Sequence, residues 1–195
     1  FSSLKDGRVI QMSWAREGLQ VNGNGVSDSE VKDWNGLMSW PMELKLYNRD
    51  NDYVFTSYPV KETEKLRSKK VVSKKNIIIN NHSVNLFKDI RGEFYEINTT
   101  LTVNEAEEIG FKLRKGNENE IVVKLSDFNQ QNNTIKVTID ATKSGKYGGE
   151  NNSIVVKVKD NKITIRIIVD TNLIEVYLNE GEASLFALAY PEPDN

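Results

Sequence analysis

Alternation of apolar and polar residues along most of the chain is the feature that most constrains its fold. In Ile135–Asp140 and Lys162–Val169 every second residue is apolar, and Ile174–Leu178 repeats the pattern. Successive side chains of a β-strand point to opposite faces, so this period of two predicts strands with one apolar face and one polar face. Helical periodicity is nearly absent. The sequence therefore predicts an all-β fold.

Further strand candidates are separated by turns rich in Asn and Gly. They cover Val9–Trp14, Leu37–Tyr47, Tyr53–Ser57, Ile77–Ile79, Tyr95–Val103, Gly110–Arg114, Ile121–Leu125, Ile154–Lys159 and Ser184–Ala189. The tetrapeptide Lys159–Lys162 lies between two alternating runs and predicts a β-hairpin. Short strands without long helices between them favour an antiparallel β-sandwich, two packed sheets of concanavalin or jelly-roll type.

A helix-like stretch, Pro59–Ser68, divides the chain into two all-β parts of unequal size. We expect residues 59–69 to be a connector and residues 70–195 to hold enough strands for a complete sandwich. Residues 1–58 supply only three or four strands and contain all three tryptophans. Because so small a sheet is marginal by itself, we expect the sandwich or a further partner to cover its aromatic surface.

Composition excludes several kinds of site. The 195 residues include 26 Lys and Arg against 28 Asp and Glu, which does not give the basic field of a nucleic-acid binder. The absence of Cys and the single histidine, His82, exclude thiolate and multi-histidine metal sites. No apolar run approaches the ~20 residues of a membrane span. We expect no metal, no nucleic-acid partner and no membrane segment, and a start at Phe1 indicates a processed or partial chain.

Five segments carry motifs more specific than alternation. They are Asp6–Trp14, with a Gly-Arg-aliphatic-Trp strand; Trp34–Leu44, close to Trp-x-Gly-x-Met-x-x-Pro-Arg-Glu-Leu but with Met42 in place of the arginine; Pro59–Arg67, close to Pro-Val-x-Glu-Leu-x-x-Leu-Arg; Asp140–Gly145, a partial Asp-Arg-Thr-x-Ser-Gly turn; and Ile167–Gly181, close to Phe-Val-Asp-x-Ser-x-x-Glu-Val-Phe-x-Asn-x-Gly. In this order they resemble glycoside hydrolase family 32, the β-fructosidases that include invertases, levanases and inulinases.

The resemblance implies a five-bladed β-propeller followed by a β-sandwich. Residues 1–58 would be the end of the last blade, and residues 70–195 the C-terminal sandwich. The family's Asn-Asp-Pro-Asn, Arg-Asp-Pro and Glu-Cys motifs, which carry its catalytic carboxylates, are absent from the chain. Retaining glycoside hydrolysis needs two carboxyl groups flanking one bond. The resemblance therefore implies no catalytic residue here, no cofactor, the propeller portion of the same enzyme as partner, and a secreted or periplasmic location.

Trp14, Trp34 and Glu43 are the candidate substrate-binding residues, in the intact enzyme only. Aromatic faces contact the C–H surfaces of sugars, and the resemblance places the last blade near the rim of the catalytic pocket. The alternative for the tryptophans is packing between blades or against the sandwich. For Glu43, as for Asp170 and Glu175, the alternative is anchoring a turn or neighbouring backbone.

The function expected from the resemblance is that of the structural, non-catalytic C-terminal region of an enzyme acting on sucrose, levan or inulin. One alternative is a fructan-binding carbohydrate-binding module, in which the loops around Asp140–Gly149 and Asp170–Asn172 present polar groups to fructose. A second alternative is a domain that drives homo-oligomer formation. Calorimetric titration with levan and inulin tests the first alternative, and light scattering tests the second.

Overall fold

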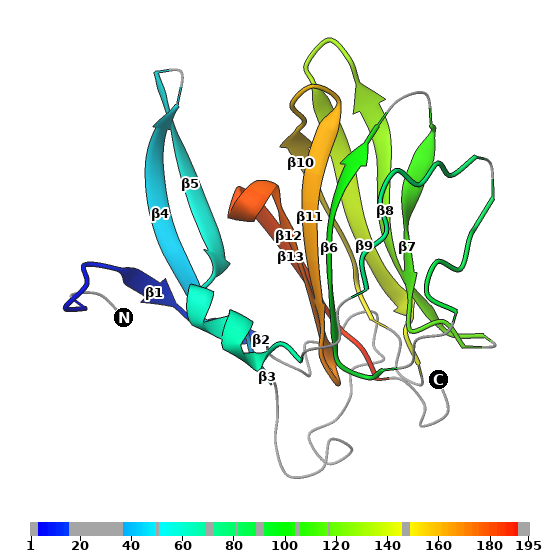
Figure 1. Ribbon diagram of the computed structural model, residues 1–195, viewed down its shortest axis with the longest axis horizontal. Helices are drawn as coiled ribbons and strands as arrows, with labels where there is room; N and C mark the ends of the chain where they lie inside the picture. Colours follow the sequence, from blue (N-terminus) through cyan, green and yellow to red (C-terminus); the bar gives the residue numbers. More distant parts are fainter. Residues whose placement is uncertain are drawn as a thin grey trace.

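The computed structural model describes residues 4–15, 37–49, 51–68, 72–80, 82–88, 92–103, 106–116, 118–145 and 149–190. The described residues form thirteen strands and two short 3-10 helices (Figure 1). The elements are β1 Val9–Gln11, β2 Trp14–Ala15, β3 Leu37–Met38, β4 Met42–Arg49, β5 Asp52–Pro59, η1 Lys61–Leu66, β6 Tyr95–Thr102, β7 Glu108–Leu113, β8 Glu120–Asn129, β9 Thr134–Lys143, β10 Asn151–Lys157, β11 Lys162–Val169, β12 Leu173–Leu178, η2 Asn179–Gly181 and β13 Ala183–Leu188.

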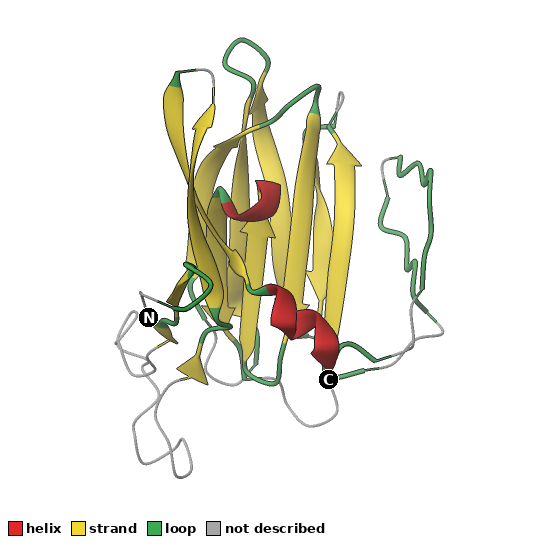
Figure 2. Cartoon of the chain, turned by 60° about the vertical axis from the view of Figure 1, so that its left-hand side comes forward, coloured by secondary structure: helices red, strands yellow, loops and turns green. Residues whose placement is uncertain are grey.

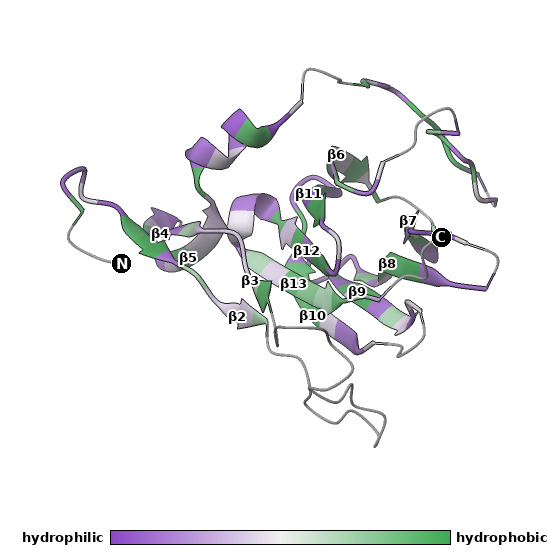
Figure 3. Ribbon diagram, turned by 90° about the horizontal axis from the view of Figure 1, so that it is seen from below, coloured by the Kyte–Doolittle hydropathy of each residue, from purple (hydrophilic) through white to green (hydrophobic). Residues whose placement is uncertain are grey.

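Two four-stranded antiparallel sheets pack face to face and form a β-sandwich. Their strand orders are β10-β9-β8-β7 and β13-β12-β11-β6. Along the strands, hydrophobic and hydrophilic residues alternate as the pleat requires (Figure 3). The all-β, antiparallel sandwich expected from the sequence is confirmed.

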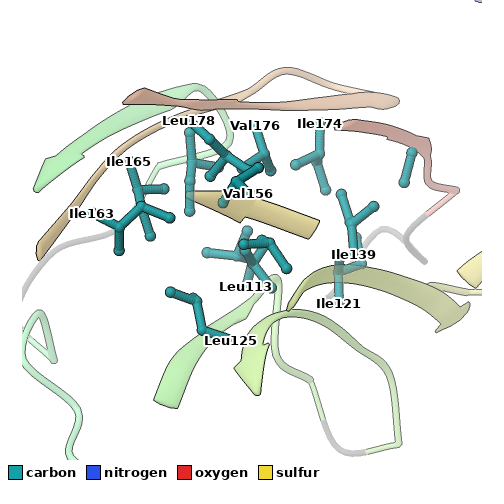
Figure 4. Packing of buried hydrophobic residues seen from close by; sticks show 14 of the residues in the cluster. Leu113, Ile121, Leu125, Ile139, Val156, Ile163, Ile165, Ile174, Val176 and Leu178 are labelled. Atoms are coloured by element: carbon teal, nitrogen blue, oxygen red, sulfur yellow. The ribbon is translucent and has the colours of Figure 1, made fainter. Parts of the chain in front are cut away.

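The core lies between these two sheets (Figure 4). Val137 and Ile139 of β9 and Ile167 of β11 are completely buried, as are most of their apolar neighbours at alternate positions. Burying one such side chain stabilises the fold by about 1.5–3 kcal/mol. Apolar burial on the inner faces of both sheets is therefore what holds the sandwich together.

A smaller sheet, of order β1-β4-β5, lies beside the sandwich (Figure 1). Strands β4 and β5 form a hairpin that is paired along its whole length, from Met42 opposite Pro59 to Arg49 opposite Asp52. The helix-like stretch expected at Pro59–Ser68 is present as the 3-10 helix η1, which leads from the small sheet toward the sandwich (Figure 2).

Two strand predictions at the start of the chain are each divided in the structure. Within Val9–Trp14, β1 pairs with β4, whereas β2 pairs with β3. Between them the Ser13 amide donates to Ser39 Oγ, and the Ser39 amide donates to the Ser13 carbonyl oxygen. Leu37–Tyr47 is divided for the same reason, because its two ends pair with different strands.

Two further predictions are wrong. Ile77–Ile79 is not a strand: its three apolar side chains do not alternate with polar ones, and Ile78 is 82% exposed. Lys159–Lys162 does form a tight turn, with Asp160 and Asn161 at positive φ, but a single bridge closes it. The strands on either side, β10 and β11, belong to different sheets, so the turn crosses between the layers of the sandwich instead of closing a hairpin.

Candidate functional site

The small sheet packs on the outer face of the β13-β12-β11-β6 sheet through a cluster that we call the junction. Met42 of β4, Ile168 of β11 and Tyr177 of β12 are buried together, with Trp40 and Tyr58 packed against them. The rings of Tyr58 and Tyr177 meet edge to face, with centroids 5.7 Å apart. Aromatic pairs of this geometry contribute about 0.5–1.5 kcal/mol beyond their buried area.

Strand β12 is buried on both of its faces because of this packing. All six of its residues, Leu173–Leu178, are buried, whereas the strands of the opposite sheet are buried mainly on alternate residues. One face of β12 lies in the sandwich core, and the other is covered at the junction. The β13-β12-β11-β6 sheet is thus the middle layer, between the small sheet and the other sheet of the sandwich.

A group of charged side chains centred on Glu96 also joins the parts. Its carboxylate accepts two hydrogen bonds from Arg67, at 2.9 and 2.7 Å, and lies 2.9 Å from Nε of the buried Arg166. The Arg166 guanidinium lies 5.2 Å from the centre of the Tyr58 ring. Partial burial raises the pKa of Glu96, but the hydrogen bonds from Arg67 and Asn98 and the two arginine charges outweigh it, and the pKa is lowered. Glu96 therefore links Arg67, directly after η1, to β6 and β11 as a charged group.

Glu175 is the buried carboxylate of the junction. Its oxygens accept hydrogen bonds from the Tyr177 hydroxyl at 3.0 Å and from the Trp40 amide at 3.4 Å. Burial raises the pKa of Glu175, and these two hydrogen bonds offset only part of that effect. Asp170 accepts a hydrogen bond from the Thr171 amide at 2.6 Å. Both carboxylates hold neighbouring backbone, which is the anchoring role set out above as their alternative.

A glycine brings the turn after β12 against the small sheet. Gly181, at φ +93°, lies so close to β5 that a Cβ there would be 2.5 Å from the Ser57 carbonyl oxygen. Such a contact is too short for any side chain, so the junction requires glycine at this position.

Gly181→Ala is expected to lower the free energy of unfolding by about 1–3 kcal/mol, because alanine must adopt a left-handed backbone and also push β5 away. Gly7→Ala is the matched control: Gly7 also has positive φ, at +77°, but no atom of the described residues lies within 4 Å of the added Cβ. Urea denaturation of both variants measures the difference. Equal losses of stability would show that the turn does not press on β5.

A cavity of about 330 Å³ opens between the small sheet and strands β12 and β13. Its lining includes Trp14, Phe55 and Phe186 as aromatic groups and Ser184 and Glu175 as polar ones. Trp14 is 58% exposed. The volume lies at the lower end of the range for small-molecule sites, and such sites combine apolar walls with a few polar groups.

Of the two candidate substrate-binding residues that the structure describes, one lines this cavity. Trp14 lines it, whereas Glu43 is not among the lining residues and pairs with Lys45 at 3.1 Å. Trp34 lies outside the described residues. Phe186 and Ser184 were not anticipated, because alternation in β13 identifies outward-facing residues without saying that another layer faces them.

Two kinds of site have no candidate in the part of the chain that the structure describes. No group of three or more acidic or histidine side chains there is placed to hold a metal ion. Among the same residues, no helix has the length and apolar character needed to cross a bilayer.

The architecture described above is that of a β-sandwich preceded by a small β-sheet, and it has counterparts among solved structures. Fructan 1-exohydrolase IIa from Cichorium intybus superimposes with a TM-score of 0.76 at 18% identity, over 98% of this chain and 41% of that protein. Sucrose-6-phosphate hydrolase from Lactobacillus gasseri superimposes with a TM-score of 0.67 at 19% identity, over 98% of this chain and 36% of that protein. At these identities the likeness establishes the fold.

Sequence comparison gives the family. The family described as "Glycosyl hydrolases family 32 C terminal" matches residues 62–195, so the chain belongs to glycoside hydrolase family 32 and contains its C-terminal domain. The levanase of Bacillus subtilis (strain 168) is 28% identical over 96% of this chain. The chain spans only 27% of that levanase, so it corresponds to a small part of its relative.

Proposed function

We propose that the chain is the C-terminal portion of an enzyme that hydrolyses β-fructosides, and that its role there is structural and not catalytic. In this proposal residues 1–58 complete the last blade of a propeller and residues 70–195 form the sandwich. Residues 59–69 connect the blade to the sandwich. The names of the relatives, levanase and fructan 1-exohydrolase, support β-fructosides as the substrate class.

The observation that carries the proposal is the unequal covering of the β4–β5 hairpin. At one end of the hairpin, Met42 is buried against the sandwich. Toward the other end Leu46, Tyr53 and Phe55, on the same face, are 64%, 70% and 55% exposed. Apolar side chains gathered in this way typically mark a surface that another protein part covers. The propeller portion of the same enzyme is the occupant that we propose for it.

Assays of the purified chain with sucrose, levan and inulin are expected to release no fructose, because the family's paired catalytic carboxylates lie outside it. The Bacillus subtilis levanase, assayed in parallel, is the positive control. Fructose release by the purified chain above the blank would contradict the non-catalytic role.

A chimera tests the structural role directly. The part of the Bacillus subtilis levanase that aligns with this chain would be replaced by the chain itself. We expect a soluble chimera that hydrolyses levan, whereas the levanase lacking that part is expected to be inactive or insoluble. A chimera that folds no better than the truncated levanase would overturn the proposal.

The cavity beside Trp14 favours a second, compatible role, contact with a fructoside in the intact enzyme. The exposed Trp14 indole offers a face for sugar C–H groups, and Glu175 and Ser184 offer polar partners nearby. Trp34 and Glu43 remain proposed substrate-binding residues of the intact enzyme, apart from this cavity. Loss of affinity for fructo-oligosaccharides in a Trp14→Ala chimera, with the fold unchanged, is the result expected.

A further inference from the structure

A second and larger hollow lies on the side of the sandwich opposite the junction. It is a groove of about 1090 Å³ across the outer face of the β10-β9-β8-β7 sheet, with lining residues from all four strands. Four strands spaced about 4.8 Å apart make a surface about 14 Å wide. The groove is therefore long enough for more than one monosaccharide unit of a chain laid across the strands.

A row of hydrogen-bonding side chains from β8, β9 and β10 lines the groove. Lys124 of β8 lies opposite Thr138 of β9, which in turn lies opposite Ser153 of β10. Thr138 lines the groove and is only 6% exposed although it faces outward, so this residue forms part of the floor. Ser153 is exposed on the same row. A row of this kind offers both donors and acceptors, as a sugar hydroxyl requires.

Ion pairs hold the lysines of the groove in place. Lys124 Nζ lies 3.0 Å from a Glu108 oxygen, and Lys112 Nζ lies 3.0 Å from a Glu120 oxygen. Among the described residues, the lining carries three lysines and four carboxylates, which are Lys112, Lys124, Lys136, Glu107, Glu108, Asp127 and Asp140. This near-balance gives no strong field for an anionic or cationic polymer. A neutral ligand rich in hydroxyl groups is the class that matches it.

Apolar groups interrupt the polar lining. Val122 lies opposite Asp140 in the row next to Thr138, and Phe128 lines the groove near the end of β8. Sugars present C–H faces as well as hydroxyls, and aromatic or aliphatic groups placed among hydrogen-bonding side chains contact those faces. A sheet face that is only exposed to solvent does not need apolar side chains placed among hydrogen-bonding ones in a hollow.

We propose that this groove binds a fructan chain, at a site separate from the cavity at the junction. The choice of fructan among neutral polysaccharides rests on the proposed function. In this assignment the sandwich holds polymer on one side while its other side supports the remainder of the enzyme.

Isothermal titration calorimetry of the 195-residue chain with levan and with inulin tests the site, and dextran serves as a neutral polymer of different sugar. Binding of a fructan with measurable heat is expected, with none for dextran. Ser153→Trp places a large ring at the β10 end of the row of hydrogen-bonding side chains, over the groove, and is expected to weaken binding at least about tenfold. Thr138→Val, which removes the Thr138 hydroxyl, is expected to weaken it about threefold to tenfold. Lys157→Trp is the matched control, because Lys157 is exposed on the same strand but does not line the groove.

Each outcome has one meaning, provided that circular dichroism shows the variants folded. Weakening by Ser153→Trp but not by Lys157→Trp supports the groove. Absence of heat with both fructans, equal heats with dextran, or loss of binding only in Trp14→Ala overturns it. The levanase chimera tests the proposed function independently, so an active chimera without groove binding would reject this inference alone.

Discussion

Replacing Tyr177 by alanine is expected to lower the free energy of unfolding by about 3–5 kcal/mol, the range for truncating a buried aromatic side chain. Tyr177 is 1% exposed, and its ring packs against Tyr58, Met42 and Ile168 at the junction. The substitution leaves a cavity between the sandwich and the small sheet. It also removes the hydroxyl that donates to the buried Glu175.

Two further variants separate these contributions. Tyr177→Phe keeps the ring and removes only the hydrogen bond to Glu175, so we expect a loss of about 1.5–3 kcal/mol, the range for a bond to a charged group. Tyr53→Ala removes an aromatic ring that is 70% exposed, and its effect is expected to stay within about 0.5 kcal/mol. Urea denaturation measures all three. If Tyr177→Ala cost no more than Tyr177→Phe, the ring would not be packed at the junction.

The sandwich could be predicted from the sequence because the pattern that specifies its strands, alternation of apolar and polar residues, lies within each strand. In β9 and β11 the apolar residues fall on alternate positions, and these are the residues that fill the core. The strands with which β10 and β11 pair could not be predicted. The turn Lys159–Lys162 has the residues of a hairpin, but whether its flanking strands stay in one sheet depends on partners far away in sequence.

The junction shows the same limit at the candidate site. Alternation in β12 assigns Glu175 and Tyr177 to the outer, polar face, and that assignment of faces is correct. Both are nonetheless buried, because the small sheet covers that face. The marginal size of the N-terminal sheet and the resemblance to a two-part family indicated that a second layer exists. The residues that this second layer buries are determined by long-range packing, and no local sequence pattern predicts them.

The second large effect is expected from Glu96→Gln, which removes the charge that faces Arg166. Arg166 is 5% exposed, so the change leaves a buried guanidinium without its carboxylate. Breaking a fully buried pair costs about 3–5 kcal/mol; because Glu96 keeps 19% of its side chain exposed, we expect about 2–4 kcal/mol. Glu62→Gln is the matched control, since Glu62 also accepts two hydrogen bonds from one arginine, Arg8, but on the surface, where such pairs contribute little.

The pH dependence of this loss identifies its electrostatic origin. The folded-state pKa of Glu96 lies below the ordinary value of 4.5, so its charge contributes stability that is complete above that value and is lost as the pH falls through the folded-state pKa. The stability difference between the unchanged chain and Glu96→Gln is therefore expected to be largest near neutrality and to shrink below about pH 4.5. Glu175, whose pKa burial raises, titrates in both proteins and cancels from the difference. Urea midpoints from pH 7 to pH 3 measure it, and a difference that stays constant would assign the loss to packing and not to the ion pair.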